Sequence, residues 1–272
     1  MKRIVKIVLL LCLVSCNCLA YDFQADGVYY RITNRWKRTV EVTHWEEMTG
    51  EGGRPRRLWH HHDCCGHDHS KPLSRKHLKL IQLDEEAVQR EKTAYIGKVV
   101  VPPVVKYRGI KYRVVGIGDG SFFNRKQLTE VELPEGITYI GAAAFENCVS
   151  LREVQLPTTV TRIGEAAFRR CMAFTTMTLP DNVRSIDVYA FAFCEELTSL
   201  RLSAAVDTFP GNIVFHCVKL KTIVVPCTVP PVVRNDLGLI MDFRKMTFLI
   251  PAAVLSRYRD DEFWRKQKLR AE

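Results

Sequence analysis

The stretch Ile140-Gly-Ala-Ala-Ala-Phe-Glu-Asn-Cys-Val-Ser-Leu-Arg-Glu-Val-Gln-Leu-Pro157 is one unit of a pattern that recurs along the chain. Its apolar residues return at a constant offset of 23 residues, so each position of the unit forms a column. The columns are Ile117, Ile140, Ile163, Ile186 and Phe209; Phe122, Phe145, Phe168 and Phe191; Cys148, Cys171, Cys194 and Cys217; Leu128, Leu151, Phe174, Leu197 and Leu220; and Val131, Val154, Met177, Leu200 and Ile223. A fixed period of roughly 20 to 50 residues indicates a solenoid or a similar repeat array.

The spacing within one unit predicts how the chain turns. Val154 and Leu156 alternate with polar residues, as expected of a half-buried strand, and Pro157 ends the strand because proline cannot donate to a strand ladder. Ile163 and Phe168 then carry the chain round the other side, where we expect one short helical turn. A single unit cannot bury its apolar face alone, whereas stacked units can. The predicted fold class is therefore α/β, a right-handed superhelix with a parallel strand ladder and short helical turns on its convex side.

The motif Ile-Gly-x-x-Ala-Phe-x-x-Cys-x-x-Leu-x-x-Val-x-Leu-Pro resembles the BspA-type (treponemal-type) leucine-rich repeat. It is complete over residues 140–157 and nearly complete over 163–180, and the resemblance extends over 21–43 and 93–272. The resemblance implies a leucine-rich-repeat solenoid that is secreted or surface-exposed in gut and oral bacteria. It also implies a protein that binds partners rather than catalysing a reaction.

Two repeats depart from the consensus. The third has Phe174 and Met177 where leucine and valine are usual, and the fifth has Phe209 for isoleucine and Val214 for phenylalanine. Such substitutions keep the core apolar and close to its original volume, so we expect the fold to continue through both repeats.

Residues 1–20 are predicted to be a signal peptide. A basic start precedes the apolar stretch 7–14, which is too short to span a bilayer. Two processing sites compete. Cleavage after Ala20 would start the mature chain at Tyr21, whereas a lipobox ending at Cys16 would leave that cysteine lipidated and membrane-tethered. Either site predicts a secreted or cell-surface protein.

The remaining domain boundaries follow from the same pattern. Residues 21–43 are predicted to form an N-terminal capping hairpin, 93–229 the repeat solenoid and 230–272 a C-terminal cap made of a strand and a helix. The cap would cover the apolar end of the stack. We expect the charged segment 265–272 to be a frayed tail.

Residues 44–92 depart from the pattern and are predicted to be a partly disordered insertion containing histidine and cysteine. Histidine-rich tracts bind transition metals, so zinc, copper or nickel is a candidate cofactor here. Vicinal cysteines and consecutive histidines fit no tetrahedral zinc template, however. A solvated insertion with adventitious affinity, a functional metal site and a subdomain that uses its thiols covalently all remain open. The candidate ligands are His60, His62, Cys64, Cys65, His67 and His69.

The repeated cysteines raise the question of disulfides. Cleavage after Ala20 would leave seven cysteines, an odd number that argues against a complete disulfide framework. The stacked side chains of one column point the same way, which is poor disulfide geometry. We therefore expect free, buried thiols at these positions.

The polar residues that flank the valine column are predicted to lie on the concave strand face and are the candidate ligand-binding residues. They are Glu130, Glu132, Glu153, Gln155, Thr176, Thr178, Ser199, Arg201 and Thr222. Their character grades from acidic through hydroxyl to basic, which suits a polar, extended partner. The alternative is that they are merely solvated strand residues.

Composition and motifs limit the classes of partner and of reaction that we expect for this chain. The net charge is +10, but the basic residues are scattered and no nucleic-acid-binding motif is present, so nucleic acid is not expected. The expected partner of a monomeric chain is a surface or extracellular protein, or a glycan. There is no glycine-rich phosphate loop, no metalloprotease motif and no nucleophile elbow, so no enzymatic activity is expected.

Overall fold

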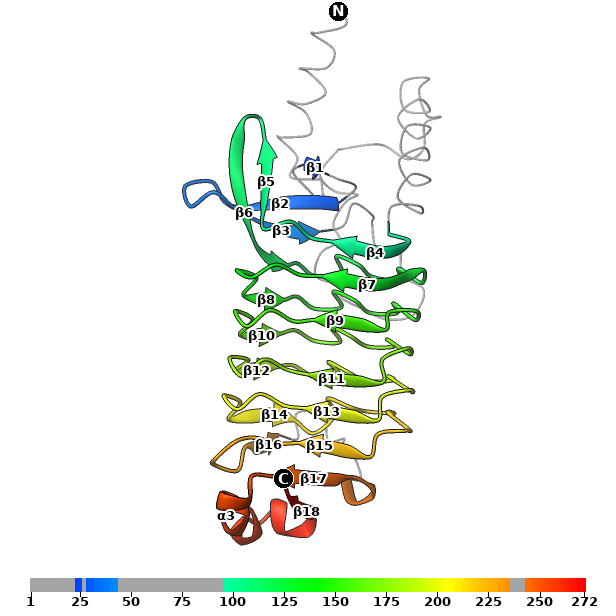
Figure 1. Ribbon diagram of the computed structural model, residues 1–272, viewed down its shortest axis with the longest axis vertical. Coiled ribbons are helices and arrows are strands. Elements are labelled where there is room, and N and C mark those ends of the chain that lie inside the picture. Colours follow the sequence, from blue (N-terminus) through cyan, green and yellow to red (C-terminus); the bar gives the residue numbers. More distant parts are fainter. Residues whose placement is uncertain (1–22, 26–27, 44–94, 235–242) are drawn as a thin grey trace, which may run out of the picture.

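The structure is a computed structural model that describes residues 23–25, 28–43, 95–234 and 243–272. These residues form a column of stacked coils in which each repeat contributes two short strands (Figure 1). Parallel pairing of like positions, such as Val131 with Val154 and Ile140 with Ile163, holds each coil to the next. The predicted solenoid with a parallel strand ladder is confirmed.

The strands of the valine column lie on one side of the coils, which we call the Val face. Seven follow the chain in order from the first coil, and an eighth is added by the C-terminus. They are β4 (Gly97–Val100), β7 (Leu128–Glu132), β9 (Glu153–Gln155), β11 (Thr176–Thr178), β13 (Ser199–Arg201), β15 (Thr222–Val224), β17 (Thr247–Ile250) and β18 (Lys268–Ala271).

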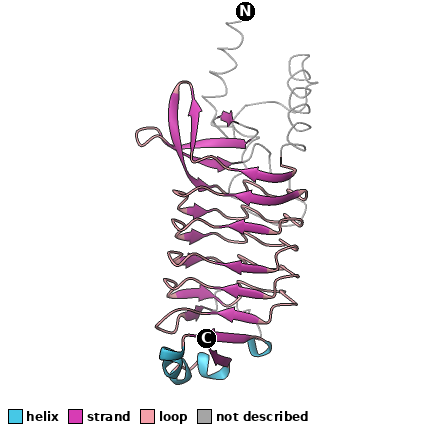
Figure 2. Ribbon diagram, viewed as in Figure 1, coloured by secondary structure: helices cyan, strands magenta, loops and turns pink. Residues whose placement is uncertain are grey.

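The strands of the isoleucine column lie on the other side, which we call the Ile face. They are β3 (Thr39–Thr43), β6 (Ile110–Ile117), β8 (Tyr139–Ile140), β10 (Arg162–Ile163), β12 (Ser185–Ile186), β14 (Thr208–Pro210) and β16 (Val232–Arg234). The prediction of short helical turns on this side is wrong, since the described repeats form strands and turns here (Figure 2). The fold is a β-solenoid with little helix.

The backbone explains why no helix forms. After β6, β8, β10 and β12 the chain enters the left-handed region twice, for example at Ala143 (φ 51°) and Asn147 (φ 62°), and this interrupts a right-handed helix. The amide of Phe145 then donates to the carbonyl of Ala167, and that of Phe168 to Ala190, at 2.7 and 2.8 Å. Backbone hydrogen bonds therefore run between coils instead of along a helix.

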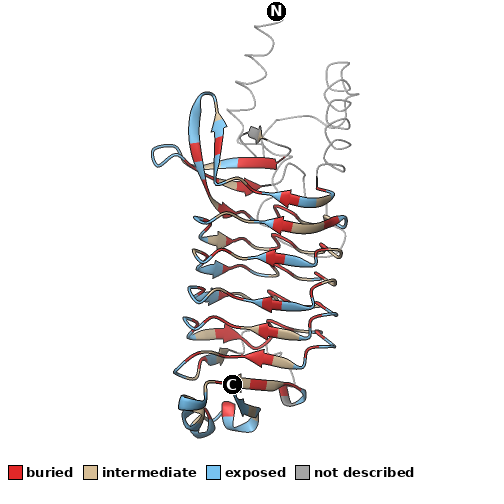
Figure 3. Cartoon of the chain, viewed as in Figure 1, coloured by how far each residue is buried: buried red, intermediate tan, exposed pale blue. Residues whose placement is uncertain are grey.

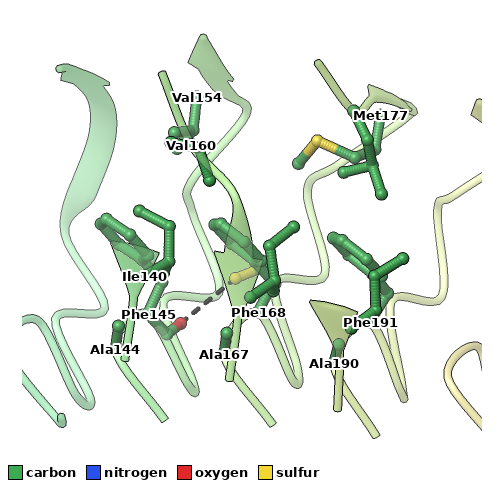
Figure 4. Close-up of a cluster of buried hydrophobic side chains, with 14 of the residues drawn as sticks. Ile140, Ala144, Phe145, Val154, Val160, Ala167, Phe168, Met177, Ala190 and Phe191 are labelled. Carbon is green, nitrogen blue, oxygen red and sulfur yellow. Dashed lines mark hydrogen bonds between the residues drawn. The ribbon is translucent and has the colours of Figure 1, made fainter. Parts of the chain in front are cut away.

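Stacked side chains fill the interior between the two faces (Figures 3 and 4). The rings of Phe122, Phe145, Phe168 and Phe191 are fully buried and nearly parallel, with successive centroids 5.0, 5.2 and 5.4 Å apart. This spacing is close to the distance of about 4.8 Å between neighbouring strands. Like residues thus stack on like residues.

Strand pairing is interrupted once on each face of the described solenoid. On the Val face the pairing stops between β9 and β11, and on the Ile face between β12 and β14. Each interruption adjoins a repeat with an unusual core residue: Phe174 and Met177 in the first case, Phe209 in the second. On the Ile face the amides of Gly141, Gly164 and Asp187 each donate to the preceding coil, and the equivalent residue of the next coil is Pro210, which has no amide hydrogen to donate. The ladder therefore loses pairing there while the coil continues.

Hairpins cover the N-terminal end of the stack. β1 (Phe23–Ala25) pairs antiparallel with β2 (Val28–Asn34), and β2 pairs antiparallel with β3, which confirms the predicted capping hairpin. β3 then pairs in parallel with β6, so the cap continues directly into the Ile face. β5 (Val104–Tyr107) forms a second hairpin with β6. The predicted insertion 44–92 lies outside the described residues, as does the predicted signal peptide.

The C-terminal cap contains the helical segments of the described structure (Figure 2). They are η1 (Phe243–Lys245), η2 (Ala252–Val254), α3 (Leu255–Asp260) and η3 (Trp264–Lys266). The hydroxyl of the buried Tyr258 donates to the carbonyl of Cys227, and the indole of the buried Trp264 to that of Pro231, both at 2.9 Å. These two hydrogen bonds hold the helical segments α3 and η3 of the predicted cap against the end of the last coil.

The prediction of a frayed tail over 265–272 is wrong. β18 pairs in parallel with β17, with Leu269 opposite Phe248, and the amide of Glu272 donates to the carbonyl of Ile250 at 2.9 Å. Leu269 continues the apolar column and packs against the core, and β18 covers the edge that β17 would otherwise expose. Among the described residues, no helix is both long and apolar enough to cross a bilayer.

Candidate binding face

Strand periodicity builds the candidate site on the Val face. Its central column, which includes Val131, Val154 and Leu200, is buried, so the residues on either side of that column point outward. The structure brings all nine candidate residues together in the two flanking columns. Glu132, Glu153, Gln155, Thr176 and Thr178 are exposed, and Glu130, Ser199, Arg201 and Thr222 are half-buried (Figure 3).

Lys98 offsets one of the two carboxylate charges at the acidic end of this face. It stands opposite Glu130 in the strand register, and its ammonium group lies 2.9 Å from Glu130 Oε1 and also pairs with Glu132. The hydrogen bond that Lys98 donates to Glu132, followed by the one it donates to Glu130, raises the pKa of Lys98. Sequence reasoning missed this lysine, although it precedes Val99 as Glu130 precedes Val131.

The basic character predicted for Arg201 is also compensated. Its guanidinium donates to Asp181 Oδ1 at 2.8 Å, and this hydrogen bond is the main reason why the pKa of Asp181 is lowered. The carboxylate of Glu153 differs from Glu130, Glu132 and Arg201, which pair with charged partners. Its hydrogen-bond donor is the neutral amide of Gln155, at 3.0 Å. Glu153 therefore adds a negative charge to the one that Lys98 leaves at Glu130 and Glu132.

β18 extends the face with cations that the sequence reasoning assigned to a frayed tail. Lys268 pairs with Thr247 and Arg270 with Leu249, so the two cations continue the two polar columns, and both are exposed. The charge of the Val face thus runs from Glu153, through the hydroxyl residues, to Lys268 and Arg270. The positive end lies at the C-terminal cap, farther along than Arg201.

The cysteine column has a structural role. The thiols of Cys148, Cys171, Cys194 and Cys217 are buried and free, as expected. Each donates to the carbonyl of the phenylalanine 26 residues earlier, over 2.9 to 3.2 Å. Burial raises the pKa of the Cys148 thiol to about 12, and that of Cys171 well above its usual value. Buried neutral thiols of this kind are poor nucleophiles.

The candidate metal ligands cannot be placed. His60, His62, Cys64, Cys65, His67 and His69 all lie outside the described residues. Within the described ranges, no three histidine, cysteine or acidic side chains come together in a way that would hold a metal ion.

Comparison with known proteins identifies the repeats. A family model described as the BspA type leucine rich repeat region matches residues 115–235 in six copies. No curated protein sequence matches the chain.

Two of three similar solved structures share the fold, with TM-scores above 0.5. The T. pallidum leucine-rich-repeat protein TpLRR is 17% identical, with a TM-score of 0.57 over 92% of this chain and 98% of that chain. The pneumococcal vaccine antigen PcpA is 19% identical, with a TM-score of 0.53 over 64% of this chain and 41% of that one. A leucine-rich-repeat protein of Bacteroides ovatus is 24% identical, with a TM-score of 0.48 over 87% of this chain and 57% of that one. This chain therefore spans about half the length of two of these relatives. Its repeats over residues 115–235 are BspA-type leucine-rich repeats.

Proposed function

We propose that this chain is an exported, non-enzymatic protein of the bacterial surface that binds a polar, extended partner, a protein or a glycan, through the Val face. The observation that carries this proposal is the arrangement of two exposed polar columns on either side of one buried column. Repeat solenoids commonly use such extended strand faces for binding.

The electrostatics of the face favour a partner with charges of both signs. Glu153 would receive a cationic group, and Lys268 and Arg270 an anionic group, with the hydroxyls of Thr176, Thr178 and other residues hydrogen-bonding between them. Charges on an exposed surface steer association and fix register more than they add affinity. The likeness to PcpA, a vaccine antigen, is in keeping with an exported protein.

A binding screen with the purified chain against arrays of extracellular proteins and of glycans tests this proposal. The test variant combines Glu153→Lys with Arg270→Glu, which reverses both ends of the face without changing the net charge. The matched control combines Glu165→Lys with Arg184→Glu, two exposed residues beside the Ile-face strands. We expect the test variant to lose binding by about tenfold or more and the control to keep it.

The same assay distinguishes binding through the Val face from the second candidate function, metal binding by residues 60–69. Binding that survives EDTA supports the Val face. Binding that needs zinc, copper or nickel, and that both double variants retain, would instead assign the function to the histidine- and cysteine-rich segment.

A further inference from the structure

Two turns project from the N-terminal end of the solenoid, the turn between β2 and β3 to one side and the β5–β6 hairpin along the long axis (Figure 1). The turn 35–38 precedes β3, and the turn at Arg108 and Gly109 precedes β6. β3 and β6 are parallel, with Thr39 opposite Arg113, and the amide of Arg113 donates to the carbonyl of Arg38 at 2.8 Å. Both turns therefore leave the stack at the same corner. We call residues 31–39 and 104–113 the twin hairpin tips.

The twin hairpin tips are strongly basic. Between 28–43 and 104–113 the chain has one carboxylate, Glu41, which lies 3.5 Å from Arg31 and also accepts a hydrogen bond from the Tyr139 hydroxyl. The same two segments hold eight cations: Arg31, Arg35, Lys37, Arg38, Lys106, Arg108, Lys111 and Arg113.

Two of these cations face each other without compensation. Lys106 stands directly opposite Lys111 in the antiparallel register of β5 and β6, and both are exposed. Like charges at such a pair destabilise a sheet. Several cations elsewhere in the described solenoid have carboxylate partners, for example Arg169 with Glu146 and Lys219 with Glu196. The tips thus carry positive charge that an external anion would neutralise.

Apolar side chains stand among these cations. Trp36 is 97% exposed at the end of its turn, between Arg35 and Lys37. Ile110, at the end of the second hairpin, and Val104 are each 43% exposed. An indole so exposed on a projecting turn, with a cation on either side, matches the preference of tryptophan for the membrane–water interface.

We propose that the twin hairpin tips bind an anionic lipid bilayer. Trp36 and Ile110 would enter the headgroup region, while the surrounding lysines and arginines contact lipid phosphates. Each basic residue near an anionic surface contributes to attraction that falls off within a Debye length. Bound in this way, the solenoid is held at its N-terminal end and its Val face stays open. A projecting pair of tips fits a surface better than it fits a single polysaccharide chain.

Vesicle co-sedimentation of the full chain tests this proposal, in a Cys16→Ser background that removes the predicted lipid-attachment residue. The probes are vesicles of phosphatidylglycerol with phosphatidylethanolamine, and vesicles of phosphatidylcholine alone. We expect binding to the anionic vesicles that weakens with added salt. Arg35→Glu combined with Lys111→Glu should lower the partition coefficient at least about tenfold. Trp36→Ala should lower it less while leaving the salt dependence intact.

The matched control is Arg184→Glu combined with Lys221→Glu, which makes the same change in net charge at exposed positions elsewhere on the coils. Thermal unfolding checks the fold, and the tip variant should be no less stable because it removes the Lys106–Lys111 repulsion. Equal losses in both variants would show that net charge alone drives binding, and would overturn the proposal. So would equal binding to both kinds of vesicle, or binding to heparin with none to vesicles.

Discussion

The thiol of Cys171 donates a hydrogen bond of 3.2 Å to the carbonyl oxygen of Phe145, which belongs to the preceding coil. Both residues are fully buried, so this carbonyl has no access to water. The cysteine column therefore links successive coils through their side chains. A residue in this column must be small, apolar enough for the core and able to donate, and cysteine meets all three requirements.

Replacing Cys171 tests this account. Cys171→Ala removes the donor and leaves the buried carbonyl of Phe145 with one bond fewer, which should lower the free energy of unfolding by about 1–3 kcal/mol. Cys171→Ser reduces the side-chain volume by an amount similar to that in Cys171→Ala but keeps a donor. We therefore expect a smaller decrease in the free energy of unfolding. Chemical denaturation of both variants measures the difference. A serine variant that is less stable than the alanine variant would mean that apolar burial, rather than the hydrogen bond, selects cysteine.

The buried thiols also predict how stability depends on pH. Burial raises the pKa of Cys148 to about 12, and that of the buried Cys227 to about 11, above the value of 9.0 for a free thiol. Above pH 9 the unfolded chain therefore loses protons that the folded chain keeps, so stability falls as pH rises. The slope is roughly 1.4 kcal/mol per pH unit for each fully buried thiol, up to its folded pKa.

Urea denaturation between pH 8 and pH 11 measures this slope, with Cys148→Ser as the comparison. The variant should show a shallower fall than the unmodified chain. Identical slopes would contradict the assignment to this thiol. A thiol reagent should likewise modify the cysteine column at the rate of global unfolding, because the neutral buried form does not react.

The left-handed positions of the turns predict a stabilising substitution. Ala166 has φ 52°, and the equivalent position two coils earlier is Gly120. A residue with a Cβ is strained in this region, so Ala166→Gly should raise the free energy of unfolding by about 1 kcal/mol. The neighbouring Ala167 is buried and has no positive φ, so Ala167→Gly should lower it by about the same amount or more. Thermal unfolding of the two variants should therefore shift in opposite directions.

The break in the Val-face ladder predicts a local difference in amide exchange. The amide of Arg152 donates to Thr129 and that of Thr198 to Thr175, each bond joining one coil to the previous coil. The equivalent bond from Thr175 to Arg152 is missing from the described ladder, where Phe174 adjoins it. Native-state hydrogen exchange should show faster exchange at Thr175 than at Arg152 or Thr198. Equal protection at all three amides would mean that the ladder is continuous.

The repeat period alone predicted the columns, the parallel ladder and the strand positions of all nine candidate residues, whereas two β-rich runs before the repeats predicted the hairpin cap. It could do so because a 23-residue repeat puts like residues on like residues, whatever the turn between them. The turn itself could not be read from residue types. Alanine at 143 and 166 favours a helix, yet both residues adopt left-handed conformations because their neighbours' amides bond to the next coil. Contacts between coils, rather than local propensity, decide this segment.

The candidate site was predicted less completely than the fold. Lys98 precedes the first complete repeat, and Asp181 lies outside the strands, so column matching from Ile117 onward could not reveal either as a partner of the face. The C-terminal cations were missed for a different reason. Residues 265–272 are dominated by charge, and the single Leu269 gives no period by which a strand could be recognised. The pairing of β18 with β17 depends on the preceding turn and on the anchored Trp264.

The C-terminal strand gives a prediction that separates a paired segment from a frayed one. Leu269 packs against the core and Arg270, its neighbour, is exposed. Leu269→Asp would place a carboxylate at the end of the apolar column, so we expect a loss of about 1–3 kcal/mol in the free energy of unfolding and aggregation through the uncovered edge of β17. Arg270→Asp, with the same new side chain one residue later, should change stability by no more than about 0.5 kcal/mol. Denaturation and light scattering measure both outcomes, and two equally stable variants would mean that β18 does not pair in solution.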